Sequence, residues 1–337
     1  MIEQNLDPMC HPINSTCRIC QNSIGNTAYR TREMMYGLRD EFDYFQCSVC
    51  NCLQIAEFPL NMSRFYGDSY YSFNAYDGKK FKGPLGSIKR VLYTKMITGR
   101  PMVKRLVGLF TGPNDYGIFD GMDVSSDTRI LDVGCGNGRS FLYPLAEIGF
   151  KHVQGCDPYL KEPIVYRNGL RINNTSIHNM CEAFDIITYH HSFEHIEDPL
   201  ENLEKAFSLL SEGGVCVVRI PTVSSFAWEH YRTDWAQLDA PRHFFLHSIE
   251  SMRLLAKKSG FELTNVVYDS THFQFSGSEK YRNDTPLSAP RIKGIFKFVE
   301  RKLKKFQYTR MAERLNREKK GDQACFFLKK TTASIYP

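Results

Sequence analysis

Short apolar runs alternate with amphipathic segments through the second half of the chain. The runs predict seven β-strands at 129–133, 152–156, 175–178, 184–189, 215–220, 261–268 and 324–328. Apolar residues at helical spacing predict helices between them, at 139–148, 197–210 and 248–259. This alternation predicts a doubly wound α/β fold, in which helices cover both faces of a mainly parallel sheet.

The first part of the chain lacks this alternation. An aromatic and polar stretch at 65–73 suits either a substrate pocket and its lid or packing between two domains. Residues 88–110 predict a moderately basic helix. We therefore divide the chain into an N-terminal domain at 1–62, a connecting region at 63–122 and a main domain at 123–337.

The composition is that of a globular protein with a substantial core, since 42% of the 337 residues are hydrophobic. No run approaches the ~18 uncharged apolar residues of a membrane span. The N-terminus lacks the basic start and apolar stretch of a secretory signal. Eleven cysteines without such a signal indicate a reducing compartment, so we expect a cytoplasmic protein.

Two C-x-x-C pairs lie near the N-terminus with 26 residues between them. They are Cys17 with Cys20, and Cys47 with Cys50. Two such pairs typically supply four thiolates to one tetrahedral Zn²⁺. Gln21 and Asn51 follow the pairs and tolerate the tight backbone turn of a zinc knuckle, and the segment 29–44 is β-rich, as in a zinc ribbon. Four thiolates leave no open coordination position, so we expect structural zinc.

Three further potential ligands lie near these pairs. Cys52 fits a packed thiol better than a fifth ligand, while Cys10 and His11 are spare. A redox role is disfavoured because neither pair opens a helix after a βαβ strand.

The first predicted strand of the main domain leads into three alternating glycines, Gly134, Gly136 and Gly138. Glycines at this spacing let backbone N–H groups approach a ligand closely, and the next helix points its positive end at the same place. Asp157 ends the second strand, where doubly wound folds hold a ribose diol. The third glycine comes one position earlier than in G-x-G-x-x-G, and no triphosphate-binding G-x-x-x-x-G-K-[ST] loop is present.

The D-x-G-x-G-x-G arrangement resembles motif I of the class I S-adenosylmethionine (SAM)-dependent methyltransferases. The resemblance implies a Rossmann-like, seven-stranded sheet whose final strand is antiparallel. It also implies that the glycine loop lies under the methionine part of SAM and that the later acid holds the ribose. The expected cofactor-binding residues are Asp132, Gly134, Cys135, Gly136, Asn137, Gly138, Asp157, Pro158 and His190.

Two further segments, 189–199 and 234–243, are similar to loops of a broad bacterial group of these enzymes. Members of that group often carry an N-terminal four-cysteine ribbon and occur among enzymes that modify cell-surface sugars and polysaccharides. The resemblance implies that the end of the fourth strand faces the methyl group and the acceptor. We therefore expect methyl transfer to a sugar or glycan precursor, at a hydroxyl.

Histidines are concentrated in the loops that a doubly wound sheet places beside its ligands. Six of the ten lie in these loops, at 190–195 and 221–243, or just beyond them in the case of His247: His190, His191, His195, His230, His243 and His247. Histidine titrates near neutral pH and suits a general base. The expected catalytic residues are His191, His195, Asp239, Arg242 and His243.

Each of these residues has a structural alternative. His191 and His195 suit contact with the acceptor or cofactor, but also capping of the next helix. Asp239, Arg242 and His243 suit an acceptor site, with His243 as base, but also an internal salt bridge. The inverted motif H-x-x-E-H at 191–195 is typical of a metal site, but it is disfavoured here because it falls in a loop.

Positive charge gathers in one segment. The net charge is +6, yet residues 291–320 alone contain twelve Lys or Arg and three Glu, so the remainder is slightly acidic. Apolar residues at helical intervals predict a basic amphipathic helix within an insertion at 278–320. It suits packing on the core, an anchor at the inner face of the membrane, or a patch for an anionic partner.

Two alternatives to sugar methylation remain open. One is an RNA or other nucleic-acid methyltransferase, which the slightly acidic remainder disfavours. The other is a non-catalytic SAM-binding scaffold, which the intact glycine loop and its two acids disfavour. The sequence leaves open the acceptor, the choice between oxygen, nitrogen and carbon methylation, and the oligomeric state.

Overall fold

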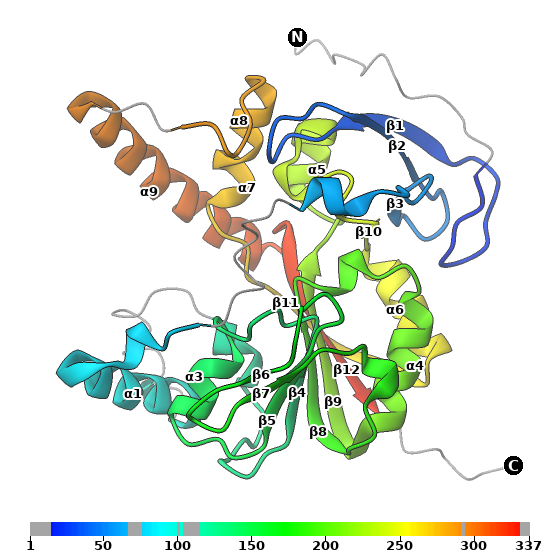
Figure 1. The fold of residues 1–337 in the computed structure, drawn as a ribbon. Coiled ribbons are helices and arrows are strands. Elements are labelled where there is room, and N and C mark those ends of the chain that lie inside the picture. Colours follow the sequence, from blue (N-terminus) through cyan, green and yellow to red (C-terminus); the bar gives the residue numbers. More distant parts are fainter. Residues whose placement is uncertain (1–14, 67–75, 100–101, 104–114, 291–293, 331–337) are drawn as a thin grey trace, which may run out of the picture.

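The computed structural model describes residues 15–66, 76–99, 102–103, 115–290 and 294–330 (Figure 1). Its central sheet has eight strands in the spatial order β11-β12-β9-β8-β4-β5-β7-β6. The bounds are Ile130–Val133 (β4), Val153–Cys156 (β5), Ile164–Val165 (β6), Arg171–Asn173 (β7), Phe184–His190 (β8), Leu210–Pro221 (β9), Phe261–Tyr268 (β11) and Gln323–Lys330 (β12).

The direction of the strands confirms the predicted doubly wound fold. Strands β7, β5, β4, β8 and β9 pair in parallel, whereas β12 is antiparallel to both β9 and β11. The final antiparallel strand is therefore as the resemblance implied. An added edge strand, β6, pairs antiparallel with β7.

Helices cover both faces of this sheet (Figure 1). Helices α4 (Pro199–Leu209) and α6 (Ile249–Lys258) lie on one face, and α1 (Gly83–Thr98) and α3 (Leu142–Glu147) lie on the other. The side chains of β4 alternate accordingly: Leu131 packs into the core under α4 and α6, and Ile130 into the core under α3. A strand buried on both faces reads as a continuous apolar run.

Two predicted elements differ in place. The third strand lies at Arg171–Asn173, not at 175–178, where the chain forms a 3-10 helix, Ile177–Asn179. Ile177 is buried and produced the apolar signal, whereas β7 has a single buried residue, Ile172, which is too little pattern to detect. The helix predicted at 88–110 corresponds to α1, which begins earlier, at Gly83, and ends at Thr98; residues 100–101 and 104–110 lie outside the described ones.

The N-terminal segment folds as a ribbon whose sheet is completed by the main domain. Strands β1 (Thr27–Arg32), β2 (Glu41–Gln46) and β3 (Leu53–Ile55) are joined by β10 (Phe245–Leu246). This pairing fixes the chain just before β10, which holds the candidate residues at 239–243, against the ribbon. Of the aromatic stretch at 65–73, residues 67–73 lie outside the described ones.

Two short helices, α7 (Phe273–Ser276) and α8 (Ser278–Arg282), lead to the basic helix α9 (Ile295–Arg317), and another short helix, α5 (Phe226–Tyr231), follows β9. The C-terminal half of α9 packs on the body: Tyr308 stacks on Phe275 at 5.2 Å between ring centroids, and Ala312 is buried. The N-terminal half extends away from the body (Figure 1). In the described ranges, no helix is both long and apolar enough to cross a bilayer.

Candidate functional site

The glycine loop forms a tight turn at the carboxyl end of β4. Gly134, Gly136 and Gly138 all have positive φ values, of 67°, 55° and 66°. Side chains disfavour this conformation, and a Cβ added to Gly134 would lie 2.5 Å from Cβ of Ser192. Glycine is therefore required both for the turn and for its close packing against the loop after β8.

Asp157 connects this loop to the end of β5. Its Oδ2 accepts a hydrogen bond of 2.8 Å from the amide of Gly136, and its Oδ1 accepts one of 2.9 Å from Tyr159. Burial raises the pKa of Asp157, although these two bonds act in the opposite direction. Each carboxylate oxygen keeps a second lone pair for a ligand hydroxyl.

Asp132 and His190 form a buried pair beside the glycine loop. The hydroxyl of Thr188 donates to Oδ1 of Asp132 at 2.8 Å, and Nδ1 of His190 lies 3.2 Å from the same oxygen. A carboxylate only accepts, so Nδ1 carries a proton, and in the neutral ring the lone pair is on Nε2. Nε2 is buried without a hydrogen-bond partner among the described residues, as expected for an atom that faces a ligand.

The remaining predicted cofactor residues lie around the same loop. Cys135 is half-buried, Asn137 is buried and its carbonyl accepts from the Tyr166 hydroxyl at 2.7 Å, and Pro158 is exposed. The structure thus gathers all the predicted cofactor residues at the carboxyl ends of β4, β5 and β8. Their contacts with SAM stay a prediction.

A second group of polar side chains lies just beyond β8, around Glu194. Glu194 is fully buried, and within the described ranges neither of its carboxylate oxygens has a hydrogen-bond partner. Nδ1 of His191 lies 3.6 Å away and Nε2 of His243 lies 3.8 Å away from its Oε1. Burial acts to raise the pKa of Glu194, but the surrounding imidazoles offset this and lower it to about 2.

His195 and His243 are both held by backbone carbonyls. Nδ1 of His195 donates to the carbonyl of Arg242 at 2.7 Å, and Nδ1 of His243 donates to that of Gln237 at 2.8 Å. These bonds leave the lone pair of each neutral ring on Nε2. Burial lowers the pKa of His243 to about 4, so this ring is neutral at pH 7.

Arg242 lies in an internal ion-pair network, the alternative that the sequence left open. Its side chain is 1% exposed and donates to Asp239 at 2.6 Å, to Glu33 at 2.9 Å and to the carbonyl of Phe65 at 3.0 Å. Its guanidinium is therefore engaged within the protein. This geometry favours a positioning role for Arg242 over direct contact with an acceptor.

His191 and His247 differ sharply in environment. His191 is exposed, has a φ of 52° and lies at the rim, with Nε2 3.4 Å from Nη1 of Arg219. His247 is fully buried between the rings of Phe193 and Phe245, and burial lowers its pKa to about 3. His191 therefore lies at the exposed edge of the candidate site, 3.6 Å from Glu194, whereas His247 is a core residue.

Sequence reasoning missed two acids of this region as site residues. The sequence presents Glu194 only as part of a metal motif, although an acid between two histidines is a usable signal. Glu33 carried no signal, because its partner Arg242 is 209 residues away in the chain. A buried ion pair between distant segments leaves no local pattern.

The four cysteines form a cluster at one end of the ribbon. The sulfur atoms of Cys17 and Cys50 are 3.5 Å apart and those of Cys20 and Cys47 are 3.4 Å apart. All four lie within 4.8 Å of one another. Tetrahedral Zn²⁺ with bonds of about 2.3 Å sets sulfur atoms about 3.8 Å apart, so the cluster fits zinc.

The turns around the cluster are as predicted. Gln21 and Asn51 adopt left-handed backbone conformations, with φ of 65° and 57°. The amides of Ile19 and Val49 each donate to a cysteine sulfur at 3.4 Å. Cys52 is fully buried, with its thiol near the carbonyl of Leu246. Cys10 and His11 lie outside the described residues.

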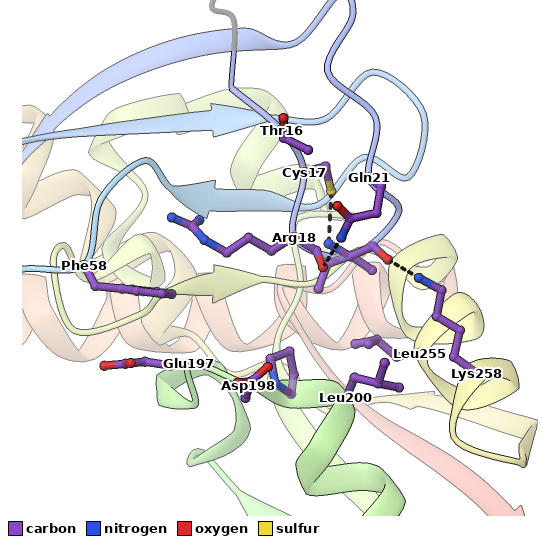
Figure 2. Close-up of a pocket in the computed structure, with 12 residues that line it drawn as sticks. Thr16, Cys17, Arg18, Gln21, Phe58, Glu197, Asp198, Leu200, Leu255 and Lys258 are labelled. Atoms are coloured by element: carbon purple, nitrogen blue, oxygen red, sulfur yellow. Dashed lines mark hydrogen bonds between the residues drawn. The ribbon is translucent and has the colours of Figure 1, made fainter.

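A cavity of about 550 Å³ separates the ribbon from helices α4 and α6 (Figure 2). Arg18 stretches along one wall with its guanidinium 4.5 Å from the centre of the Phe58 ring, and Lys258 closes the other side by donating to the carbonyl of Ile19 at 2.7 Å. None of the predicted cofactor residues lines it.

Comparison with known proteins gives one domain match. Residues 103–266 match a family model described as a methyltransferase domain. A tRNA U34 carboxymethyltransferase of Pseudomonas fluorescens is 27% identical over 152 residues. The match covers 41% of this chain and 47% of that enzyme, so the chain spans about half the length of this curated relative.

Solved structures with similar arrangements are distant in sequence. A SAM-dependent methyltransferase of Thermotoga maritima, described as a possible histamine N-methyltransferase, is 21% identical, with a TM-score of 0.40 over 61% of this chain and 83% of that one. A SAM-dependent methyltransferase of Mesorhizobium loti is 16% identical, with a TM-score of 0.41 over 65% of this chain and 98% of that one.

Proposed function

We propose that this chain, a SAM-dependent methyltransferase by its domain match and its fold, transfers the methyl group to a hydroxyl of a sugar or glycan precursor. One observation carries the choice of a hydroxyl. Side chains that can accept a proton converge beyond β8, namely His191, Glu194, His195, Asp239 and His243. A hydroxyl must lose its proton as its oxygen bonds to carbon, so it needs a base at this position.

We assign the crevice at the carboxyl ends of β4 and β5 to the cofactor. The free lone pairs of Asp157 suit the two ribose hydroxyls, and the glycine loop suits the methionine part. SAM supplies an electrophilic methyl group on sulfur. Nε2 of His190 is buried and unpaired within the described part of the chain. In this assignment it faces the ligand between the crevice and the histidines His191, His195 and His243.

The imidazoles beyond β8 have different environments, which bears on their roles toward the acceptor. His243 is neutral and its Nε2 lies 3.8 Å from Oδ2 of Asp239, which stabilises the ring once it accepts a proton. His191 lies at the exposed rim. We assign the role of general base to the imidazoles of His191 and His243. The hydroxyl proton passes to one of them as the oxygen–methyl bond forms and the sulfur–methyl bond breaks. Arg242 holds Asp239 and, through its carbonyl, His195.

A second candidate acceptor is RNA. The likeness to the tRNA U34 carboxymethyltransferase favours it, as does the concentration of Lys and Arg in α9. A ribose 2′-hydroxyl would lose its proton to the same imidazoles, those of His191 and His243. RNA binding would weaken steeply with salt, because each phosphate contact releases counterions.

The test is a transfer assay with methyl-labelled SAM and three acceptor pools: nucleotide sugars, glycan fragments and total RNA. We expect label in a sugar or glycan, and loss of labelling when the accepting hydroxyl is replaced by hydrogen. His243→Asn should lower the rate while affinity for S-adenosylhomocysteine is kept, whereas His152→Asn, at an exposed position, serves as control. Labelling of RNA alone would favour the second candidate, and labelling of amines alone would contradict the proposal.

A further inference from the structure

We propose that Glu194, His195 and His243 form a binding site for a divalent transition-metal cation, separate from the four-cysteine cluster. One ligand atom from each of these residues lies within 4.8 Å of the others. The residues come from two segments: Glu194 and His195 from the turn after β8, and His243 from the loop before β10. The cluster is therefore built by the fold and not by one local motif.

The two histidines are oriented as metal-binding histidines usually are. Nδ1 of each ring donates to a backbone carbonyl, at 2.7 Å for His195 and 2.8 Å for His243. Such a bond fixes the tautomer, leaves the lone pair on Nε2 and makes the ring a better ligand. Nε2 of His243 lies 3.8 Å from Oε1 of Glu194.

Glu194 supplies the second, independent observation. Its carboxylate is fully buried, and among the described residues neither oxygen receives a hydrogen bond. A buried carboxylate is costly unless it is paired or binds a metal. Nε2 of His243 lies 3.8 Å from Oε1, too far for a good hydrogen bond but suitable for sharing a cation.

The distance between two of the proposed ligands fits a bound cation, and the third ligand atom lies within 4.8 Å of both. Bonds of about 2.1 Å allow two ligand atoms up to about 4.2 Å apart, and the 3.8 Å between His243 and Glu194 lies within this limit. Two imidazole nitrogens and one carboxylate oxygen suit Mn²⁺, Fe²⁺, Co²⁺ or Zn²⁺. Asp239, with Oδ2 3.8 Å from Nε2 of His243, is a candidate fourth ligand.

Three protein ligands leave coordination positions open for an acceptor hydroxyl. The role of the cation rests on the proposed function; its binding does not. A cation lowers the pKa of a bound hydroxyl. With Nε2 of His243 bound to the cation, the hydroxyl proton passes to His191 as the oxygen–methyl bond forms and S-adenosylhomocysteine leaves.

The test is a titration of the whole 337-residue chain, loaded with zinc, with Mn²⁺, followed by electron paramagnetic resonance and calorimetry. Mn²⁺ is a suitable probe because it prefers nitrogen and oxygen ligands to a four-thiolate site. We expect one bound Mn²⁺ per chain, and a loss of affinity of about 100-fold in both Glu194→Gln and His243→Ala. The control His152→Ala should bind Mn²⁺ as the unaltered protein does.

Zinc content and affinity for S-adenosylhomocysteine show whether each variant is folded. Unchanged Mn²⁺ affinity in folded Glu194→Gln would overturn the site, as would the absence of any Mn²⁺ or Co²⁺ binding by the unaltered protein. Methylation of a hydroxyl without Mn²⁺ binding would remove the cation site and keep the proposed function. Mn²⁺ binding without transfer to any hydroxyl would keep the cation site and remove the proposed function.

Discussion

The guanidinium of Arg242 donates to the carboxylate of Glu33 at 2.9 Å, and both side chains are fully buried. Glu33 belongs to the ribbon, where it also accepts from three successive backbone amides after β1. The carbonyl of Arg242 holds His195. One ion pair thus connects the fold of the ribbon with the position of a candidate catalytic imidazole.

We predict that Glu33→Gln lowers the free energy of unfolding by about 1.5–3 kcal/mol, because it removes one of the two carboxylates that pair with the buried Arg242, which keeps only Asp239. The maximal methylation rate should fall more than the affinity for S-adenosylhomocysteine. Urea unfolding and calorimetry measure the two effects. Glu41→Gln, in an exposed ion pair with Arg30, is the control and should change stability by less than about 1 kcal/mol. Equal stability of the two variants would contradict the structural role of Glu33.

The hydrogen bond from the amide of Gly136 to the carboxylate of Asp157 leads to a second prediction. Asp157→Ala removes the acceptor for two backbone amides and for the proposed ribose contact. The affinity for S-adenosylhomocysteine should weaken by roughly 1–3 kcal/mol in calorimetry. Asp127→Ala, which removes an exposed ion pair with Lys151, should leave that affinity unchanged. If both variants bind alike, the ribose contact is misassigned.

The four-cysteine cluster should hold one Zn²⁺ per chain by elemental analysis. Cys47→Ser should lose it and unfold at lower temperature, because zinc binding contributes directly to the folding of small metal-bound units. Cys52→Ala should keep its zinc, since this thiol packs in the core beside Leu246. Cys181→Ser, at an exposed position, is the neutral control. Loss of zinc from Cys52→Ala would make Cys52 a ligand.

The buried carboxyl group of Asp322 leads to a prediction about how stability changes with pH. Burial raises its pKa, although Trp235 and Gln237 donate to Oδ2 at 3.0 and 3.1 Å; Oδ1 has no partner within the described residues. An acid with a raised pKa in the folded state contributes its stability below the unfolded pKa and loses it as pH rises through the folded value. Asp322→Asn, which resembles the protonated acid, should therefore gain stability relative to the unaltered protein as pH rises.

Urea unfolding at several pH values between 4 and 8 measures this difference. Asp123→Asn, at an exposed position, should show no such trend. A stability difference for Asp322→Asn that stays constant over this range would show that the buried carboxyl does not change its ionisation on folding.

The sequence predicted most of the sheet because each buried strand carries its own apolar run, as β4 and β8 do. It predicted the glycine loop because the left-handed conformations of Gly134, Gly136 and Gly138 have a local signature. It did not predict β10 or the pair of Glu33 with Arg242. Both depend on contacts between residues about 200 positions apart, which no local pattern specifies.

The N-terminal half of α9 leaves apolar side chains in water, and only the region from Tyr308 to Leu315 packs on the body. Phe296 is 86% exposed and Phe306 is 62% exposed, among many Lys and Arg residues. We propose that this half binds an anionic lipid surface, where rings enter the headgroup region and each nearby cation contributes about 1 kcal/mol.

The protein should therefore float with liposomes that contain anionic lipid, and high salt should weaken this binding. The double variant Phe298→Ser and Phe306→Ser should lose it, whereas Ile24→Ser, which removes an exposed apolar side chain of the ribbon, should not. Both changes alter exposed positions, so the fold is kept in each. Because attraction between charges is strongest at low salt, failure to float under that condition would exclude the lipid surface. The exposed rings of α9 would then need a protein or RNA partner.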